Sequence, residues 1–290
     1  ATSALANDQT STKNTLTSSV GTEGTSSSVR LQTNDVSGAS VLTLSDNTLA
    51  SVAYNNNATN GMTLAVTNAN GATAALASRQ SVDTRVSGSS TSETFGSVKL
   101  DAGIVTGASN LTVSGNSITA DNVGNSAANQ MAVTASQWDG RVAANGRVVP
   151  SLAVGTGLNT TASADLAVAN QQNVWGAGAS TAVIESNVVG TIENNFSSLT
   201  LGNITSNANT VSAAATGSTA SNTLTMSTTG MTGTTLGVAS LQVMNSGKIS
   251  STATTGDLDV GVTKTGTGDV AGGNVSVNGN AVQATSQAMP

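Results

Sequence analysis

The stretch SVRLQTNDVSGASVLTLSDNTLASVAYNNNATNGMTL, residues 28–64, recurs 69 residues later as SVKLDAGIVTGASNLTVSGNSITADNVGNSAANQMAV, residues 97–133. The two stretches align without a gap, and 15 of their 37 positions are identical. Self-similarity at a fixed offset is typical of repeat proteins, in which each unit buries its apolar face on its neighbours. The sequence therefore predicts a tandem structural repeat.

Weaker copies of the unit follow towards the end of the chain. They cover residues 178–195, 209–226, 237–250 and 272–284, and the last of them aligns with residues 108–120. We interpret residues 1–290 as a single β-repeat domain. Its expected divisions are units near 28–96 and 97–165, degenerate copies over 166–271, and half-repeats at 1–20 and 272–290.

Within the unit, apolar residues occupy alternate positions. The pattern is L-x-V-x-x-N-x-I-x-A followed by A-x-N-x-M-x-V. A period of two predicts strands with one inward face, whereas helices need a period near 3.6. Asn-Gly, Ser-Gly and Asp-Asn pairs between the runs are typical of tight turns. The sequence thus predicts an all-β chain.

Two arrangements of these strands remain open. The inward positions carry Val, Leu, Ile, Met and many Ala, which favours a narrow space between layers. A repetitive β-sandwich, with sheets about 10 Å apart, is filled by bulkier side chains. We therefore expect a repetitive β-solenoid, with about two or more coils in each 69-residue unit, and keep the sandwich as the alternative.

Asparagines recur at one turn position of the unit. Stacked coils would bring them into a ladder in which side-chain amides hydrogen-bond from one coil to the next. The expected ladder consists of Asn47, Asn116, Asn187, Asn209 and Asn280.

The composition is poor in groups that do chemistry. Only 8% of the residues are charged and 2% are aromatic, and the chain has neither Cys nor His. A Ser-His-Asp or Cys-His arrangement is therefore excluded, as are disulfides and thiolate metal sites. We predict a protein that is not an enzyme, with no catalytic residues, no cofactor and no metal.

One acidic pair is the exception worth weighing. The segment GDLDVG, residues 256–261, places Asp257 and Asp259 on the same face of a strand. Convergent carboxylates cleave glycosidic bonds in polysaccharide-degrading proteins. A solvated strand face is the favoured interpretation of the pair, but a β-helix that binds or cleaves polysaccharide remains the alternative function.

Charge and hydropathy limit the partners. A net charge of −6 and scattered basic residues argue against nucleic acid. No apolar run approaches the roughly 18–20 residues that a membrane span requires. Trp138 and Trp175 lie where the repeat is interrupted, so they mark either an insertion with lateral contacts or the edge of a coil.

The segments GNSAANQ (124–130) and NNATNG (56–61) are similar to the N-x-A-x-N/Q turns of curlin-type repeats in bacterial secreted amyloid and holdfast-anchor proteins. Such proteins also lack Cys and are rich in Gly, Asn, Ser, Thr and Ala. The resemblance implies an extracellular or cell-surface filament subunit with stacked β-coils, serving adhesion or the biofilm matrix.

The two ends of the sequence suggest how subunits would join. Residues 272–290 match the first half of the unit, and TKNTLTSSV (12–20) matches its second half. We expect homopolymers in which residues 1–20 of one subunit complete the repeat begun by its neighbour, because head-to-tail contacts that do not close build filaments. The expected interface consists of Thr12, Asn14, Leu16, Val275, Val277, Asn280, Val282 and Ala284. A monomeric adhesin stalk is a further alternative.

Overall fold

The computed structural model of the 290-residue chain describes residues 2–12, 15–85, 88–140, 151–153, 159–161, 164–178, 182–245, 247–255 and 260–288. These residues form strands, turns and bends, and no helix occurs among them. The all-β prediction is confirmed.

Nearly all strands belong to five parallel columns, which we name A to E in chain order. Column A contains β1 (Thr2–Thr12), β6 (Thr73–Asp83), β13 (Leu166–Trp175) and β18 (Leu236–Asn245). Column B contains β2 (Leu16–Val20) and β3 (Ser27–Gln32), β7 (Ser90–Asp101), β14 (Ala182–Phe196), and β19 (Lys248–Thr254) and β20 (Val260–Lys264). Column C contains β8 (Ile104–Thr106), β15 (Ser198–Thr200) and β21 (Val270–Ala271).

Columns D and E complete the set. Column D contains β4 (Val41–Ser45), β9 (Asn110–Ser114), β16 (Asn203–Asn207) and β22 (Asn274–Asn278). Column E contains β5 (Thr48–Asn70), β10 (Ser117–Asp139), β17 (Thr210–Thr232) and β23 (Ala281–Gln287). Among the described residues, only the antiparallel pair of β11 (Ser151–Ala153) and β12 (Asn159–Thr161) lies outside the columns.

The chain passes through the columns four times in the order A to E. We call these passes 1 (residues 2–70), 2 (73–139), 3 (166–232) and 4 (236–287). Paired residues in column E are 69 apart between passes 1 and 2, since Ser117 lies opposite Thr48. They are 93 apart between passes 2 and 3, where Ser117 lies opposite Thr210, because β11 and β12 belong to a segment inserted there.

Strands one repeat apart are thus direct neighbours, so each 69-residue unit makes one pass. The expectation of two or more coils per unit was wrong. Its reason is strand length: β5 and β10 each run for 23 residues, so a single pass uses the whole unit. The strand pairing agrees with the sequence alignment for the copies at 209–226 and 272–284. The copies proposed at 178–195 and 237–250 belong mainly to columns B and A, so they are not equivalent to the parts of the unit with which they had been aligned.

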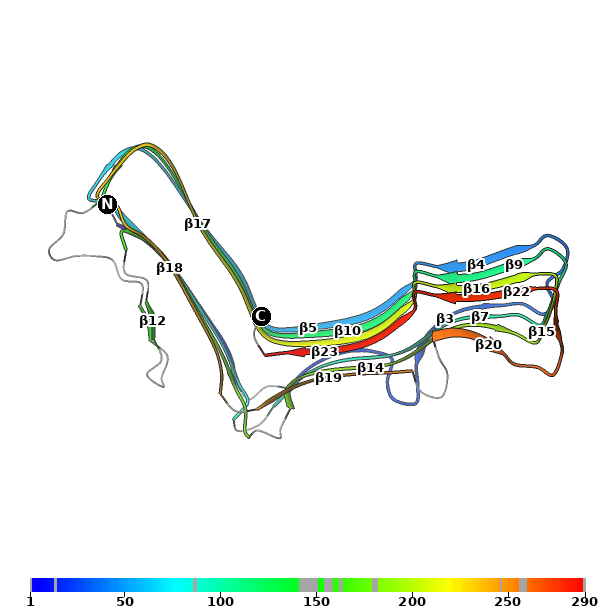
Figure 1. The fold of residues 1–290 in the computed structure, drawn as a ribbon. Helices are drawn as coiled ribbons and strands as arrows, with labels where there is room; N and C mark the ends of the chain where they lie inside the picture. Colours follow the sequence, from blue (N-terminus) through cyan, green and yellow to red (C-terminus); the bar gives the residue numbers. More distant parts are fainter. Residues whose placement is uncertain are drawn as a thin grey trace.

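Figure 1 shows two arms that meet at a bend, with the strands of each column stacked in the order of the colour bar. The long strands of column E run through both arms. Their first halves face column B, with Ile118 in an apolar cluster that includes Val98 and Ile192. Their second halves face column A, with Met131 in a cluster that includes Leu76 and Leu166. These side chains are less than 1% exposed, and burying each one contributes about 1.5–3 kcal/mol.

Both tryptophans lie inside strands and not in the inserted segment. Trp138 is in β10, buried opposite Ala69 and Met231. Trp175 ends β13, and the guanidinium of Arg85 lies 4.9 Å from the centre of its ring. Neither tryptophan therefore belongs to the insertion: Trp138 precedes it in β10, and Trp175 follows it in β13.

Candidate functional site: side-chain ladders, strand edges and a charged groove

The corner between columns D and E has the same backbone geometry in all four passes. Asp46, Gly115, Ala208 and Gly279 occupy equivalent positions there, with φ between +51° and +65°. This left-handed conformation turns the chain sharply and sets the next residue against the stack. In every pass that next residue is asparagine.

These asparagines form a ladder through the whole stack. The backbone N and the side-chain Nδ2 of Asn47 both donate to Oδ1 of Asn116, at 3.0 and 2.9 Å. Asn116 donates in the same way to Asn209, and Asn209 to Asn280. Each amide in the middle is thus both donor and acceptor, and all bonds point the same way along the stack. Asn116 and Asn209 are almost fully buried.

Asn187 does not belong to this ladder. It lies in β14, opposite Glu93 and Thr252 in column B, and its Nδ2 donates to Glu93 and Glu185. The expectation was wrong because an Asn within a period-two run resembles the turn position of the unit. The distinguishing feature is the preceding residue, which has a left-handed backbone before Asn47, Asn116, Asn209 and Asn280 but not before Asn187.

Further amide ladders, which the repeat alignment did not include, lie between the two layers near the bend. In column A, Nε2 of Gln242 donates to Gln172, Gln172 to Gln80 and Gln80 to Gln9, at 2.7–2.8 Å. In column E, Asn60 donates to Asn129 and Asn129 to Asn222. The sequence does contain a signal for the glutamine ladder, because Gln recurs at offsets of 70–92 residues. The aligned unit did not include it, because that unit begins in column B and these glutamines lie in column A.

Several of these amides also join the layers. Gln80 donates to the backbone oxygen of Ser126 and Gln172 to that of Thr219, both at 2.7 Å. Gln80 and Gln172 are fully buried, so these bonds give each amide a second acceptor and avoid a cost of about 1–3 kcal/mol for an unsatisfied donor. The interior at the bend is polar yet largely hydrogen-bonded.

The residues expected to form the subunit interface lie at opposite edges of the stack. Val275, Val277, Asn280, Val282 and Ala284 are in pass 4, in columns D and E. Thr12 and Leu16 are in pass 1, while Asn14 lies outside the described residues.

The expected split repeat was wrong in its register. Thr12 lies opposite Asp83 in column A, and Leu16 lies opposite Ser90 in column B. The alignment had equated them with Ala127 and Met131, which belong to column E. Alternating runs are so similar that a short stretch matches several columns.

Both edges of the stack expose apolar side chains that are covered further inside. We call the residues that pair with one another across successive passes a row. Val275 and Val282 are each 47% exposed, whereas Ile204 and Val211, one pass inward in the same rows, are fully buried. In pass 1, Leu5 is 37% exposed although its neighbour Leu76 is buried. These edges also end in strands whose outer backbone groups have no neighbouring strand among the described residues, a feature that favours further pairing.

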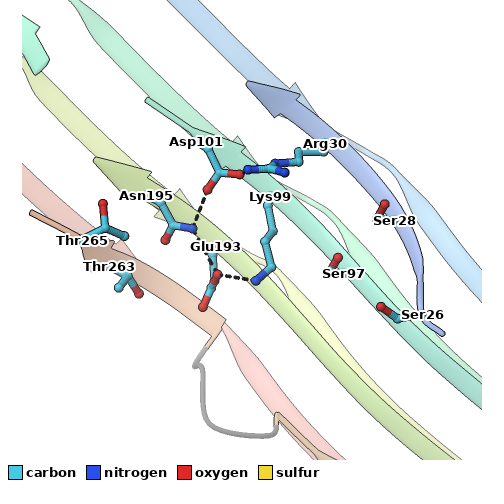
Figure 2. Close-up of a pocket in the computed structure, with 10 residues that line it drawn as sticks. All are labelled: Ser26, Ser28, Arg30, Ser97, Lys99, Asp101, Glu193, Asn195, Thr263 and Thr265. Carbon is cyan, nitrogen blue, oxygen red and sulfur yellow. Dashed lines mark hydrogen bonds and ion pairs between the residues drawn. The ribbon is translucent and has the colours of Figure 1, made fainter. Parts of the chain in front are cut away.

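A charged groove lies on the outer face of column B. Figure 2 shows Asn195 between the carboxylates of Asp101 and Glu193, with Arg30 next to Asp101 and Lys99 next to Glu193. Nζ of Lys99 lies 3.0 Å from Oε2 of Glu193, and Nδ2 of Asn195 donates to both carboxylates, at 2.7 Å to Asp101 and 3.2 Å to Glu193. Arg30 pairs with Asp101 at 2.5 Å.

The acidic pair Asp257 and Asp259 lies outside the described residues. Within the described part of the chain, no group of three or more acidic, His or Cys residues is placed to hold a metal ion. The same part contains no helix that could cross a membrane.

Comparison with known protein families, with curated proteins and with solved structures finds no match to this chain.

Proposed function

We propose that the chain is a structural subunit of an extracellular filament, and that its fold is a β-solenoid and not a repetitive β-sandwich. The winding supports this assignment, because each pass visits every column before the next pass begins. In column C, pass 1 contributes the single bridge from Val36 to Val105 in place of a strand. In-register rows of Asn and Gln that run through the stack are also typical of solenoids and stacked fibres.

The observation that carries the filament proposal is that the two edges of the stack are complementary. Every bond of the ladder from Asn47 to Asn280 points the same way, so the pass 1 edge presents Oδ1 of Asn47 as an acceptor. The pass 4 edge presents the backbone N–H of Asn280 as a donor, which is the group that donates to Oδ1 at every step inside the stack. Edges that differ but match make a heterologous contact, and such contacts generate open filaments.

The strand register supports one particular joint between subunits. Val275 occupies the row of Leu42, Val277 that of Leu44, and Val282 that of Leu49. If pass 4 continues in register onto pass 1 of the next subunit, these valines cover these leucines. The contact repeats the packing of Leu111 on Ile204 inside the stack. This whole-pass joint replaces the split repeat.

A charge placed in an inward row tests the proposal. Val277→Lys puts an ammonium into the joint, while Ser276→Lys places the same charge on the outward face of the same strand. We expect filaments in negative-stain electron micrographs of the parent and of Ser276→Lys, and single subunits for Val277→Lys. A monodisperse parent at all concentrations would reject the filament and favour the monomeric stalk.

Cysteine cross-linking tests the register, since the chain has no native Cys. Neighbouring parallel strands lie about 4.8 Å apart, within the range that a disulfide spans. Val275→Cys with Leu42→Cys should give a ladder of covalent oligomers on oxidation. Val275→Cys with Thr43→Cys, shifted by one residue, should not. Filaments without the first ladder would mean that the subunits join in another way.

The proposal includes adhesion or matrix function at the cell surface, on the resemblance to curlin-type repeats. It assigns no catalytic role to the chain, because the sequence lacks His and Cys.

A further inference from the structure

The groove on the outer face of column B is formed by two adjoining cavities. One has a volume of about 400 Å³ and the other about 540 Å³, and Ser26, Ser97 and Lys99 line both. Together they extend from Phe95 to Asp101 along β7, a length of about 20 Å at about 3.3 Å per residue. This space fits an extended chain better than a compact small molecule.

An insertion in pass 1 forms one wall of the groove. Val20 pairs with Thr94 and Ser27 with Gly96, so the six residues 21–26 stand where pass 2 has only Phe95. Thr22 and Thr25 close this insertion with two backbone hydrogen bonds of 2.9 Å. In the middle of the stack, β7 and β14 pair without interruption from Ser90 to Asp101 and form the floor.

The charges that line the groove nearly cancel. Two cations, Arg30 and Lys99, face the carboxylates of Asp101 and Glu193, each within an ion pair, and Glu23 adds one carboxylate at the wall. With its cations already paired, the groove offers no free charge to an anionic ligand such as nucleic acid. It therefore favours an uncharged ligand.

Two acceptors on the floor lack a hydrogen-bond donor. Oε1 of Glu193 and Oδ1 of Asn195 are buried and have no partner, and the two residues are 0% and 8% exposed. Leaving such atoms unsatisfied costs about 1–3 kcal/mol each, more for a charged group. A ligand rich in donors would remove that cost. The hydroxyls of Ser28, Thr263 and Thr265 are further polar groups along the lining.

The other end of the groove is partly apolar. Phe95 is half-buried there and Val189 is 39% exposed. A sugar ring matches both ends, because it has hydroxyl donors at its rim and C–H groups on its faces. A peptide strand fits less well, since the floor is the face of a sheet and its backbone groups are already paired within column B.

We propose that this groove binds a neutral saccharide chain. Ligand hydroxyls donate to Glu193 and Asn195 on the floor, and ring faces pack on Phe95 and Val189. These contact residues belong to passes 2 and 3, while passes 1 and 4 supply the walls, so a single subunit carries the whole site.

Isothermal titration calorimetry with neutral hexasaccharides tests the proposal, with cellohexaose, xylohexaose, laminarihexaose, maltohexaose and mannohexaose as probes and hexagalacturonate as the charged comparison. We expect at least one neutral probe to bind with a Kd of about 1 mM or lower. Asn195→Ala and Phe95→Ser should each raise that Kd by about tenfold. Arg85→Ala removes an ion pair outside the groove and should leave the Kd unchanged.

Three results would overturn the site: no neutral probe binds, hexagalacturonate alone binds, or both variants bind as well as the parent. Thermal unfolding followed by circular dichroism shows whether each variant keeps its fold. If Asn195→Ala unfolds, Glu193→Gln serves in its place, because it keeps the size of the side chain and changes the floor acceptor.

Discussion

The apolar arm around column D and the polar bend around column A hold the same stack together by different means. In the arm, the row of Leu42, Leu111, Ile204 and Val275 exchanges one aliphatic residue for another without loss of packing. At the bend, the row of Gln9, Gln80, Gln172 and Gln242 repeats a single residue type. An aliphatic side chain packs on any neighbour of similar shape, whereas a buried amide needs a donor and an acceptor at the matching position of the neighbouring strand.

The two regions therefore respond differently to a shift in strand register. A slip of one residue would still bury some aliphatic side chains in the arm. At the bend, the same slip would separate the buried amides of Gln80 and Gln172 from the groups to which they donate. We infer that the arm supplies most of the stabilising free energy and that the amide rows select one register.

The largest effect should come from a cavity in the arm. Leu111→Ala empties a fully buried position, so we expect the free energy of unfolding to fall by about 3 kcal/mol. Leu42→Ala, in the same row at the edge of the stack, should cost about 1 kcal/mol, because Leu42 is only half-buried. Urea unfolding of both variants in the Val277→Lys background compares them as single subunits. Equal losses would contradict the view that the edges are open.

A broken amide row should have the next largest effect. Asn116→Ala removes the oxygen that accepts from both donors of Asn47 and the amide that donates to Asn209 and Leu44, and we expect a loss of about 2 kcal/mol. Asn47→Ala removes donors only at the edge of the ladder and should cost about 1 kcal/mol or less. The same urea experiment measures both. If Asn47→Ala is the more harmful variant, the ladder is not what stabilises the corner.

In the turn before column D, one pass has a leucine where the other three have glycine, and replacing it should raise the stability of the protein. Gly38, Gly107 and Gly272 have positive φ there, and Leu201 occupies the equivalent position with φ of +60° and 64% exposure. Leu201→Gly relieves the left-handed strain at little loss of packing, so it should stabilise the protein by about 1 kcal/mol. Thr200→Gly, one residue earlier in β15, should destabilise it. Thermal unfolding gives both signs, and destabilisation by Leu201→Gly would show that its side chain packs.

The smallest effect concerns a carboxylate on the outer face of column E. Burial beside Val52 and Ala214 raises the pKa of Asp121 above its ordinary 3.8. The folded state then favours the protonated form, so this group lowers stability as the pH rises through the folded pKa. Asp121→Asn should be more stable than the parent at pH 7, and the gain should vanish below about pH 3.8. A gain that persists at low pH would not come from ionisation.

Positions marked by a turn signal in the sequence were predicted correctly, and positions within ordinary alternating runs were not. Asn47, Asn116, Asn209 and Asn280 could be aligned because a turn signal precedes each of them, whereas Asn187 was included wrongly because it lies in an ordinary alternating run. The N-terminal segment was misplaced for the same reason, since Leu16 in a period-two stretch fits any column. The groove could not be foreseen, because Lys99 and Glu193 are 94 residues apart in sequence and adjacent only through strand pairing.

The strands, their inward faces, the tight turns and the 69-residue offset follow from the amino-acid sequence alone, since they depend on neighbouring residues and on direct repetition. Three features become visible only in the folded chain: one unit makes one pass, certain residues share a row, and amides cross between the layers at the bend. The physical reason is that parallel pairing joins residues about 70–93 positions apart. An alternating strand carries no local mark of the partner on which it will stack.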